Sequence, residues 1–458
     1  MNGTIELPIW LFGLIVVFAA VTFTSHFLFP SVRWFFRARA ERLVERLNQR
    51  LERPIEPFKL ARRYDTIQRL IYDPEVTQAV VDHAAEAGLR EDVAFEEAKN
   101  YAQEIVPSFS ATAYFKLGTR GAKWLSRGLY RVRLGHYDEA LSDVSPDATV
   151  IFVMNHRSNM DYVLVTYLAA QRSALSYAVG EWARVWPLSR LIRSMGAYFI
   201  RRRSRSSLYR KVLARYVQMA TAGGVTQAIF PEGGLSLDGR TAPPKMGLLN
   251  YVLAGAEASE REVVFVPVAL NYDRVLEDRI LIKAGETGER RFRARISVIA
   301  GFVLRQLWLR ITGRFFRFGY AAVSFGTPVS LASMQGSSTE DVAEELMERI
   351  RAVVPVLPIP LVALALQRGA KSQAEVEDFA EDLLNKVPEA HVHMPRESLS
   401  YAVEVGLRGL TLRKAVSEAD ALTVTDAPLL SYYAASIEHF LPAGTMEPAA
   451  APEKSSAT

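Results

Sequence analysis

Cysteine is absent from the 458-residue chain. Its absence excludes disulfide bonds, thiolate nucleophiles and metal sites with cysteine ligands. Neither sign of charge is lacking, and the formal net charge of +5 suits an anionic partner. Membrane surfaces, phosphorylated substrates and nucleic acids all meet that requirement. The length and the 49% hydrophobic content allow two or three domains with a large buried core.

Charged side chains are absent from residues 7–32. A helix of that length spans the roughly 30 Å hydrocarbon layer of a bilayer. Arginines crowd the segment that follows, which the positive-inside rule places in the cytoplasm. A cleaved signal peptide fits less well, because only Glu6 is charged before the run and no small-x-small site follows cleanly. We expect residues 1–32 to form a single-pass transmembrane anchor in the inner (plasma) membrane, with the bulk of the protein in the cytoplasm.

Residues 33–137 show a helical pattern, with apolar residues three and four positions apart. Near its end Trp124 is interleaved with cations: Lys116, Arg120, Lys123, Arg127, Arg131 and Arg133. Two interpretations of this basic stretch remain open. It forms a solvated helical face, or it lies on anionic lipid.

Residues 138–337 alternate between short apolar runs and helical stretches, which predicts an α/β domain with a mixed, mostly parallel sheet flanked by helices. The expected strands are 148–154, 175–179, 197–200, 225–230, 263–270 and 319–325. The expected helices include 159–171, 205–222 and 247–258. The arginine-interrupted segment 290–317 predicts an interfacial helix, with a buried helix as the alternative.

Residues 338–441 predict a C-terminal helical region, with helices at 340–352, 373–387 and 428–441. Pro355, Pro358 and Pro360 are expected to break the chain before the apolar run 361–366. Residues 442–458 are rich in Ala, Pro, Ser and Glu and predict a disordered tail.

His156 follows the apolar run 150–154, and Asp161 lies five residues further on. A neutral imidazole there can take a proton from an alcohol, while the aspartate orients the ring and stabilises the imidazolium. The spacing alone is a weak signal. The alternative is a simple helix start, since Asn155 and Ser158 are good capping residues.

Three later segments add to this picture. Residues 196–203 predict a short strand that ends in Arg201, Arg202 and Arg203, and guanidinium groups bind phosphate in bidentate fashion. The alternative is a solvated charge run. Residues 229–236 place Glu232 and Gly233 at a strand end, where backbone N–H groups face a ligand. An ordinary turn with an exposed Glu232 is the alternative.

The fourth segment, residues 264–273, predicts an apolar strand that supports the site. Pro267 within it suggests an edge strand or a bulge.

In this order the four segments resemble the glycerolipid acyltransferase family, over about residues 150–273. The glycerol-3-phosphate acyltransferase branch is the more similar. Its hallmarks are similar to residues 196–202, 243–247, 266–268, 272–273, 358–366 and 430–437.

The resemblance implies transfer of a fatty acyl group from acyl-CoA or acyl-carrier protein to the 1-hydroxyl of glycerol 3-phosphate, in phospholipid synthesis at a membrane. It implies that His156 is the general base and that Asp161 orients it. Arg201 and Arg202 are the implied phosphate ligands, and Glu232 and Gly233 shape the acceptor side. Backbone N–H groups near the helix start are expected to stabilise the oxyanion. No metal or organic cofactor is implied.

The chain departs from the family pattern at Leu235 and Leu237, where the family has arginines. Two readings follow. The phosphate is held by the remaining residues, Arg201, Arg202, Ser236, Arg240 and Lys245, or the acceptor is lysophosphatidate or another lysolipid.

A non-catalytic membrane lipid-binding protein is a further alternative. The two leucines favour it, and His156, Asp161 and Glu232 oppose it. A nucleic-acid partner is not expected, because the basic residues lie beside apolar, membrane-like stretches rather than in a recognisable binding module.

Overall fold

The computed structural model describes residues 8–24, 42, 44–51, 53–135, 141–169, 173–180, 183–184, 188–201, 204, 206–288, 308, 311–312, 317–387, 391–418 and 421–441. The chain divides into two compact units, Met1–Ile55 and Glu56–Thr458. The first unit contains α1 (Ile9–Phe23), an apolar helix of 15 residues whose side chains are mostly exposed. Across the described ranges, no helix is both long enough and apolar enough to cross a membrane. The remainder of the expected span, residues 25–32, lies outside those ranges.

The second unit is built around a mixed, mostly parallel sheet, which confirms the predicted fold class. The strands are β1 (Arg131–Gly135), β2 (Thr149–Met154), β3 (Ser176–Gly180), β4 (Tyr198–Ile200), β5 (Gln227–Ile229), β6 (Val263–Tyr272), β7 (Tyr320–Phe325) and β8 (Val329–Ser330). Their order is β1-β7-β6-β2-β5-β3-β4, and β8 also pairs with β6. The five strands from β6 to β4 are mutually parallel, whereas β7 and β8 run antiparallel to β6.

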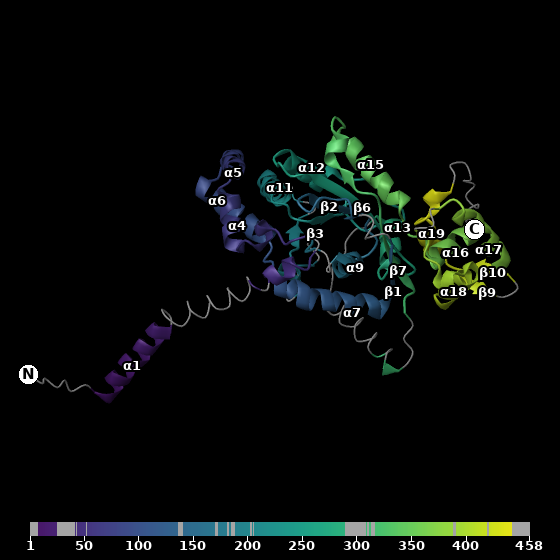
Figure 1. Cartoon of the computed structure of the whole chain (residues 1–458), viewed down its shortest axis with the longest axis horizontal. Helices are drawn as coiled ribbons and strands as arrows, with labels where there is room; N and C mark the ends of the chain where they lie inside the picture. Colours follow the sequence, from purple (N-terminus) through teal and green to yellow (C-terminus); the bar gives the residue numbers. More distant parts are fainter. Residues whose placement is uncertain are drawn as a thin grey trace, which may run out of the picture. The chain divides into compact units, whose positions relative to one another are not determined.

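Helices cover the sheet on both faces, so its strands are buried on both sides. Every residue of β2, β6 and β7 is buried, which explains why these strands are continuous apolar runs rather than alternating ones. Figure 1 shows α11 (Ser207–Ala222), α12 (Met246–Glu257) and α15 (Thr339–Ala352) above the sheet and α7 (Thr119–Leu129) and α9 (Met160–Ala169) below it. The six predicted strands and the helices expected between them are therefore confirmed, within one to three residues at most ends.

Two strand details differ from expectation. The alternating segment Arg131–Gly135 was predicted as helix but forms the edge strand β1, parallel to β7. Pro267 lies in β6, a central strand, and not at an edge. On the side of β6 that faces β2, Pro267 is paired with Val153. On the opposite side, Pro267 lies between the residues of β6 that pair with β8 and those that pair with β7. Its missing N–H therefore costs no ladder hydrogen bond there.

The N-terminal part of this unit is helical, as predicted up to Leu129. Its helices are α3 (Pro57–Leu60), α4 (Arg63–Ile71), α5 (Pro74–Ala87), α6 (Glu91–Ile105), the π-helical segment η2 (Ala113–Gly118) and α7. Helices α5 and α6 pack against α11.

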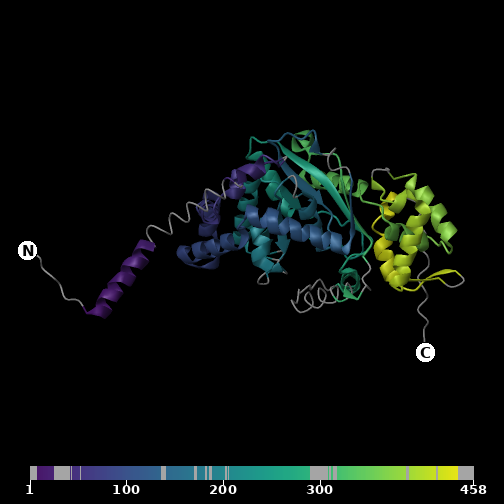
Figure 2. The same ribbon diagram turned by 60° about the horizontal axis from the view of Figure 1, so that its bottom comes forward.

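The C-terminal part is also helical, as expected. Its helices are α16 (Pro358–Gln367), α17 (Gln373–Leu384), α18 (Leu399–Leu412) and α19 (Ala427–Ala434), with a small hairpin of β9 (Val416–Glu418) and β10 (Leu422–Val424). Figure 2 shows these helices gathered at one end of the sheet. Pro355 lies in the non-helical break between α15 and α16, as expected, but the other two prolines do not extend that break. Pro358 and Pro360 lie in the first turn of α16, where a missing N–H costs nothing.

Two other predicted segments lie largely or wholly outside the described residues: the interfacial helix at 290–317 and the tail at 442–458.

Candidate active site

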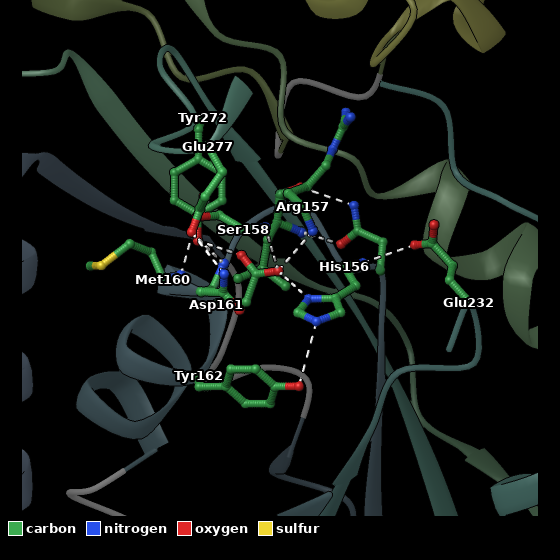
Figure 3. Close-up of polar contacts among 12 residues, drawn as sticks. His156, Arg157, Ser158, Met160, Asp161, Tyr162, Glu232, Tyr272 and Glu277 are labelled. Atoms are coloured by element: carbon green, nitrogen blue, oxygen red, sulfur yellow. Dashed lines mark hydrogen bonds and ion pairs between the residues drawn. The ribbon is translucent and has the colours of Figure 1, made fainter. Parts of the chain in front are cut away.

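The central feature of the site is a buried imidazole–carboxylate pair. His156 Nδ1 lies 2.8 Å from Asp161 Oδ2, and the two side chains are 2% and 0% exposed (Figure 3). β2 ends at Met154, and Asp161 lies in the first turn of α9, so the loop between them brings the two groups together. The alternative of a bare helix start is inadequate, because the ring itself is held by the carboxylate.

Asp161 is fixed by four donors. Oδ2 accepts the Arg157 and Ser158 backbone N–H groups at 2.7 and 3.1 Å as well as the histidine ring. Oδ1 accepts the Tyr272 hydroxyl at 2.6 Å, from the end of β6 (Figure 3). A carboxylate has enough lone pairs to accept all four bonds. With Asp161 accepting, Nδ1 carries the hydrogen and the lone pair of the ring is on Nε2.

The backbone of His156 is held separately from its ring. Its N–H donates to Glu232 Oε1 at 2.8 Å, and its carbonyl accepts the Ser236 N–H at 2.9 Å. The other oxygen of Glu232 accepts the Ala242 N–H at 3.0 Å. Burial raises the pKa of Glu232 to about 7, although the two N–H donors lower it. Glu232 is thus a buried brace for the histidine loop and not an exposed turn residue.

The remaining N–H groups of the loop are also engaged. Glu277, which precedes α13 (Asp278–Thr287), accepts the Ser158 hydroxyl at 2.7 Å and the Asn159 side-chain and backbone N–H groups. The Met160 N–H donates to Ser158 Oγ, and the Asp161 N–H to the Ser158 carbonyl. Every N–H from residue 156 to 161 therefore has a partner within the protein. The expectation that these groups stabilise an oxyanion is not supported by this arrangement.

Aromatic rings enclose the imidazole. The Phe230 ring lies 4.3 Å from it between centroids, and the Tyr162 ring packs edge-on at 5.3 Å. The Tyr162 hydroxyl is 3.4 Å from His156 Nε2 and is the polar group drawn beside that atom in Figure 3. Tyr177 stacks on Tyr162 at 5.2 Å. Nε2 thus lies in an aromatic surround, and the polar group beside it is the Tyr162 hydroxyl.

Two neighbours of His156 tie the loop to the sheet. The Asn155 side chain donates to the Leu270 carbonyl at 3.0 Å and accepts its N–H at 2.7 Å, which extends the β2–β6 ladder by one residue. Arg157 is buried and donates to the Gly239 carbonyl and, at 3.5 Å, to Asn271 Oδ1. Gly239 has φ +89°, and a Cβ there would lie 1.9 Å from the Tyr432 carbonyl oxygen, so only glycine fits.

Arg201 lies at the same carboxyl edge of the sheet as His156, because β2 and β4 run in the same direction. Three strand spacings, about 14 Å, separate their strands. Its guanidinium donates to both Glu104 oxygens, at 2.9 and 2.6 Å, and Arg184 also contacts this carboxylate. Burial opposes ionisation of Glu104, but the two arginines outweigh it and hold its pKa below the usual value. Arg202 lies outside the described residues.

The other predicted substrate-binding residues form the turn after β5. Gly233 has φ +64°, and the Lys245 Cδ would lie 2.8 Å from a Cβ at that position. Ser236 is buried, and its hydroxyl donates to the Arg240 carbonyl at 2.7 Å. Arg240 pairs with Glu438 at 2.7 Å. The turn is therefore near His156, but Ser236 and Arg240 already have protein partners.

The residues that the sequence did not predict come mostly from distant parts of the chain. Tyr272, Glu277 and Glu104 contact the site residues across 111, 118 and 97 positions. Of these three residues, only Tyr272 was indicated by the sequence, because it lies in the segment 264–273 that was expected to support the site. In the described part of the chain, no group of three or more His, Asp or Glu side chains is arranged to hold a metal ion.

Residues 137–271 match the family model described as Acyltransferase, in agreement with the resemblance that the motifs predicted. The chain is also 27% identical to the glycerol-3-phosphate acyltransferase of Pseudomonas fluorescens (strain Pf0-1) over 419 residues, which cover 83% of this chain and 49% of that protein. It is 29% identical to the glycerol-3-phosphate acyltransferase of Aeromonas hydrophila subsp. hydrophila, over 83% of this chain and 50% of that protein.

The chain thus spans about half the length of the curated relatives it matches. Among solved structures, the 1-acyl-sn-glycerophosphate (LPA) acyltransferase from Thermotoga maritima is similar, with a TM-score of 0.33 and 21% sequence identity. The match covers 53% of this chain and 77% of that one.

Proposed function

We propose that this protein transfers a fatty acyl group from acyl-CoA or acyl-carrier protein to the 1-hydroxyl of glycerol 3-phosphate, in phospholipid synthesis. The observation that carries the proposal is the buried His156–Asp161 pair, whose other ring nitrogen, Nε2, lies 3.4 Å from the Tyr162 hydroxyl. The match to the Acyltransferase family model and the glycerol-3-phosphate acyltransferase relatives support it.

His156 acts as the general base. Nε2 takes the proton of the acceptor hydroxyl while that oxygen attacks the thioester carbonyl carbon. Asp161 stabilises the imidazolium through its 2.8 Å bond to Nδ1. The tetrahedral intermediate then expels the thiolate, which takes the proton back from Nε2. No protein nucleophile is required, because the acceptor's own oxygen forms the new ester bond.

Tyr162 is the proposed donor to the tetrahedral oxyanion. The Tyr162 hydroxyl lies 3.4 Å from Nε2, beside the point of attack, and 3.4 Å from the Ala178 carbonyl oxygen. A donor in a half-buried site stabilises developing negative charge far more than one in water.

Arg201 binds the acceptor's phosphate in this proposal, with Arg184 as its neighbour. Two guanidinium groups share the single Glu104 carboxylate, so the cluster keeps a net positive charge. Arg202 and Lys245 remain further candidates. Glu232 and Gly233 shape the acceptor side by holding the histidine loop.

A lysolipid such as lysophosphatidate is the second candidate acceptor. Leu235 and Leu237 favour it, because both are partly buried and pack against the core close to the Glu232 turn. An apolar wall there accommodates an acyl chain better than a free polyol.

The protein acts at the cytoplasmic face of the inner membrane in this proposal, held by an anchor within residues 1–32. The apolar, exposed helix α1 and the arginines that follow it support this placement.

The experiment is a side-by-side assay of one acyl donor with glycerol 3-phosphate, dihydroxyacetone phosphate and lysophosphatidate, with thiol release as the readout. We expect the highest kcat/KM with glycerol 3-phosphate. A higher kcat/KM with lysophosphatidate would make lysophosphatidate the acceptor in place of glycerol 3-phosphate. No thiol release with any of the three acceptors, from either donor, would reject acyl transfer.

A further inference from the structure

Helix α7 and the preceding η2 form an amphipathic element on the surface of the second unit (Figures 1 and 2). One stripe is buried: Tyr114, Gly118, Ala122, Ser126 and Leu129. Helix α7 packs against α9 and β1, and η2 packs against α10. The opposite stripe is exposed and consists of two apolar and four basic side chains: Lys116, Leu117, Arg120, Lys123, Trp124 and Arg127. We call this exposed stripe the α7 face.

The α7 face carries four basic side chains and no acidic one. No Asp or Glu occurs between Glu104 and Asp138, so the element has no acidic partner of its own. Exposed cations elsewhere pair along their own helices, as Lys99 does with Glu96 and Arg349 with Glu345. Among the described residues, by contrast, Lys116, Arg120 and Lys123 form no ion pair. Clustered, unneutralised cations on one face indicate an anionic partner.

The same face exposes large apolar side chains. Leu117 is 68% exposed and Trp124 66%. Trp124 borders an open hollow of about 420 Å³ that it shares with Arg120, Lys123, Arg127 and Gly128. A tryptophan and a leucine among lysines and arginines match the chemistry of the bilayer interface, where the ring lies at headgroup level and the cations contact lipid phosphates.

We infer that the α7 face is a lipid-docking surface that lies on an anionic bilayer. A nucleic acid would satisfy the charge but would leave Leu117 exposed to water, so the observations favour lipid. The inference rests on the membrane-bound part of the proposed function and does not depend on acyl transfer. Because α7 packs against α9, which carries Asp161 and Tyr162, docking there brings the histidine loop near the lipid surface.

The cysteine-free sequence permits a direct test with the full-length chain. Leu117→Cys, labelled with an environment-sensitive fluorophore, reports on the α7 face. Leu412→Cys is the matched control, since Leu412 ends α18 and is 64% exposed. Each labelled protein is reconstituted with vesicles of phosphatidylglycerol and phosphatidylcholine or of phosphatidylcholine alone, with and without spin-labelled lipid.

We expect a blue-shifted, lipid-quenched emission at position 117 and a water-like emission at position 412. The shift at 117 should be larger with phosphatidylglycerol. Replacing Lys116, Arg120 and Lys123 together by Ser should weaken the phosphatidylglycerol-dependent component about tenfold or more. Thermal unfolding checks that this variant is folded.

Equal emission at both positions overturns the inference. Emission at position 117 that is the same with and without phosphatidylglycerol also overturns it. A shift at 117 produced by duplex DNA and not by vesicles would assign the face to nucleic acid instead. His156→Ala should keep the lipid response in full, so loss of acyl transfer and loss of docking are distinguishable.

Discussion

At the residue scale, the protein holds His156 through both its ring and its backbone. Asp161 binds Nδ1, Glu232 binds the N–H, and Ser236 binds the carbonyl oxygen. Together these bonds fix the direction of the Nε2 lone pair. Pre-orientation of this kind is what a general base requires.

Removal of the Tyr272 hydroxyl tests how far Asp161 depends on the groups that donate hydrogen bonds to it. Tyr272→Phe removes the donor to Oδ1 and leaves more negative charge facing the imidazolium. We expect about a tenfold lower kcat at pH 7, little change in KM, and an acid limb of the pH–rate profile that moves to higher pH. Tyr130→Phe is the control, because its hydroxyl donates to the Arg274 carbonyl instead. An unshifted profile in Tyr272→Phe would contradict this role.

The Tyr162 hydroxyl is predicted to act on the transition state. Tyr162→Phe keeps the stacking on Tyr177 but removes the donor beside Nε2. We expect kcat to fall about 10²-fold with a small change in either KM, the typical loss for one oxyanion donor. A change confined to the acceptor's KM would instead make Tyr162 a binding residue.

Arg201 is predicted to act on the acceptor alone. Arg201→Ala should raise the acceptor's KM about tenfold or more, the worth of a charge-assisted hydrogen bond to phosphate, and barely change the thioester's KM. Arg210→Ala on the exposed side of α11 is the control. Equal effects on both substrates would mean that Arg201 serves only to hold Glu104.

At this scale the sequence predicted local pairs and missed distant ones. His156 and Asp161 are five positions apart across a strand end and a helix start, so local geometry alone brings them together. The Arg201–Glu104 pair joins residues 97 positions apart, and neither residue carries a pattern that names the other. Arg201, close to a strand end, predicted an anion-binding site. The sequence did not show that the Glu104 carboxylate already binds this side chain.

At the element scale, Asp273 connects three elements. It directly follows β6 and accepts the Tyr320 N–H of β7 at 2.7 Å and the Ile359 N–H of α16 at 2.9 Å. The second bond satisfies an N–H in the first turn of α16, which has no side-chain cap of its own. Asp273 thereby fastens the C-terminal helices to the sheet.

The raised pKa of Asp273 also predicts that the stability of the protein depends on pH. Burial raises its pKa from 3.8 to about 7, although the two N–H donors lower it. Protonation of Asp273 is therefore favoured in the folded state and adds to the free energy of unfolding. This stabilisation is complete below about pH 3.8 and is lost as the pH rises through about 7. Glu232 acts in the same direction. We expect the free energy of unfolding to fall by on the order of a few kcal/mol between pH 5 and pH 8.

Asp273→Asn is the matched variant for that measurement. It should be less stable than the wild type at pH 5, because an amide accepts only one of the two N–H groups, but its stability should change less with pH. Urea unfolding across the pH series checks this. An unchanged slope would show that Asp273 is not the titrating group.

The elements themselves were largely predictable, and the failures have clear causes. Strands buried on both faces are apolar runs, which the sequence shows plainly. β1 was missed because its basic and apolar residues continue the pattern of α7, and edge strands tolerate such exposed cations. The first turn of α16 was missed because proline in a first turn is not distinguishable from a breaker without the fold.

At the scale of the whole molecule, regions that composition separates pack as one unit. Glu56–Thr458 forms one compact unit. Arg240 binds Glu438 across 198 positions, and Asn271 binds the Pro355 carbonyl at 2.9 Å. The C-terminal helices therefore brace the turn and the strand that support the histidine loop.

The most direct test of the whole account is His156→Ala in the full-length chain, with thiol release from the acyl donor as the readout. His83→Ala is the control, because His83 also pairs with a carboxylate, Glu97 at 3.3 Å, but on the helical surface. The account predicts at least a 10²-fold loss of acyl transfer in His156→Ala, with the protein still folded and its vesicle binding unchanged. Retention of about a tenth of the activity or more would contradict it.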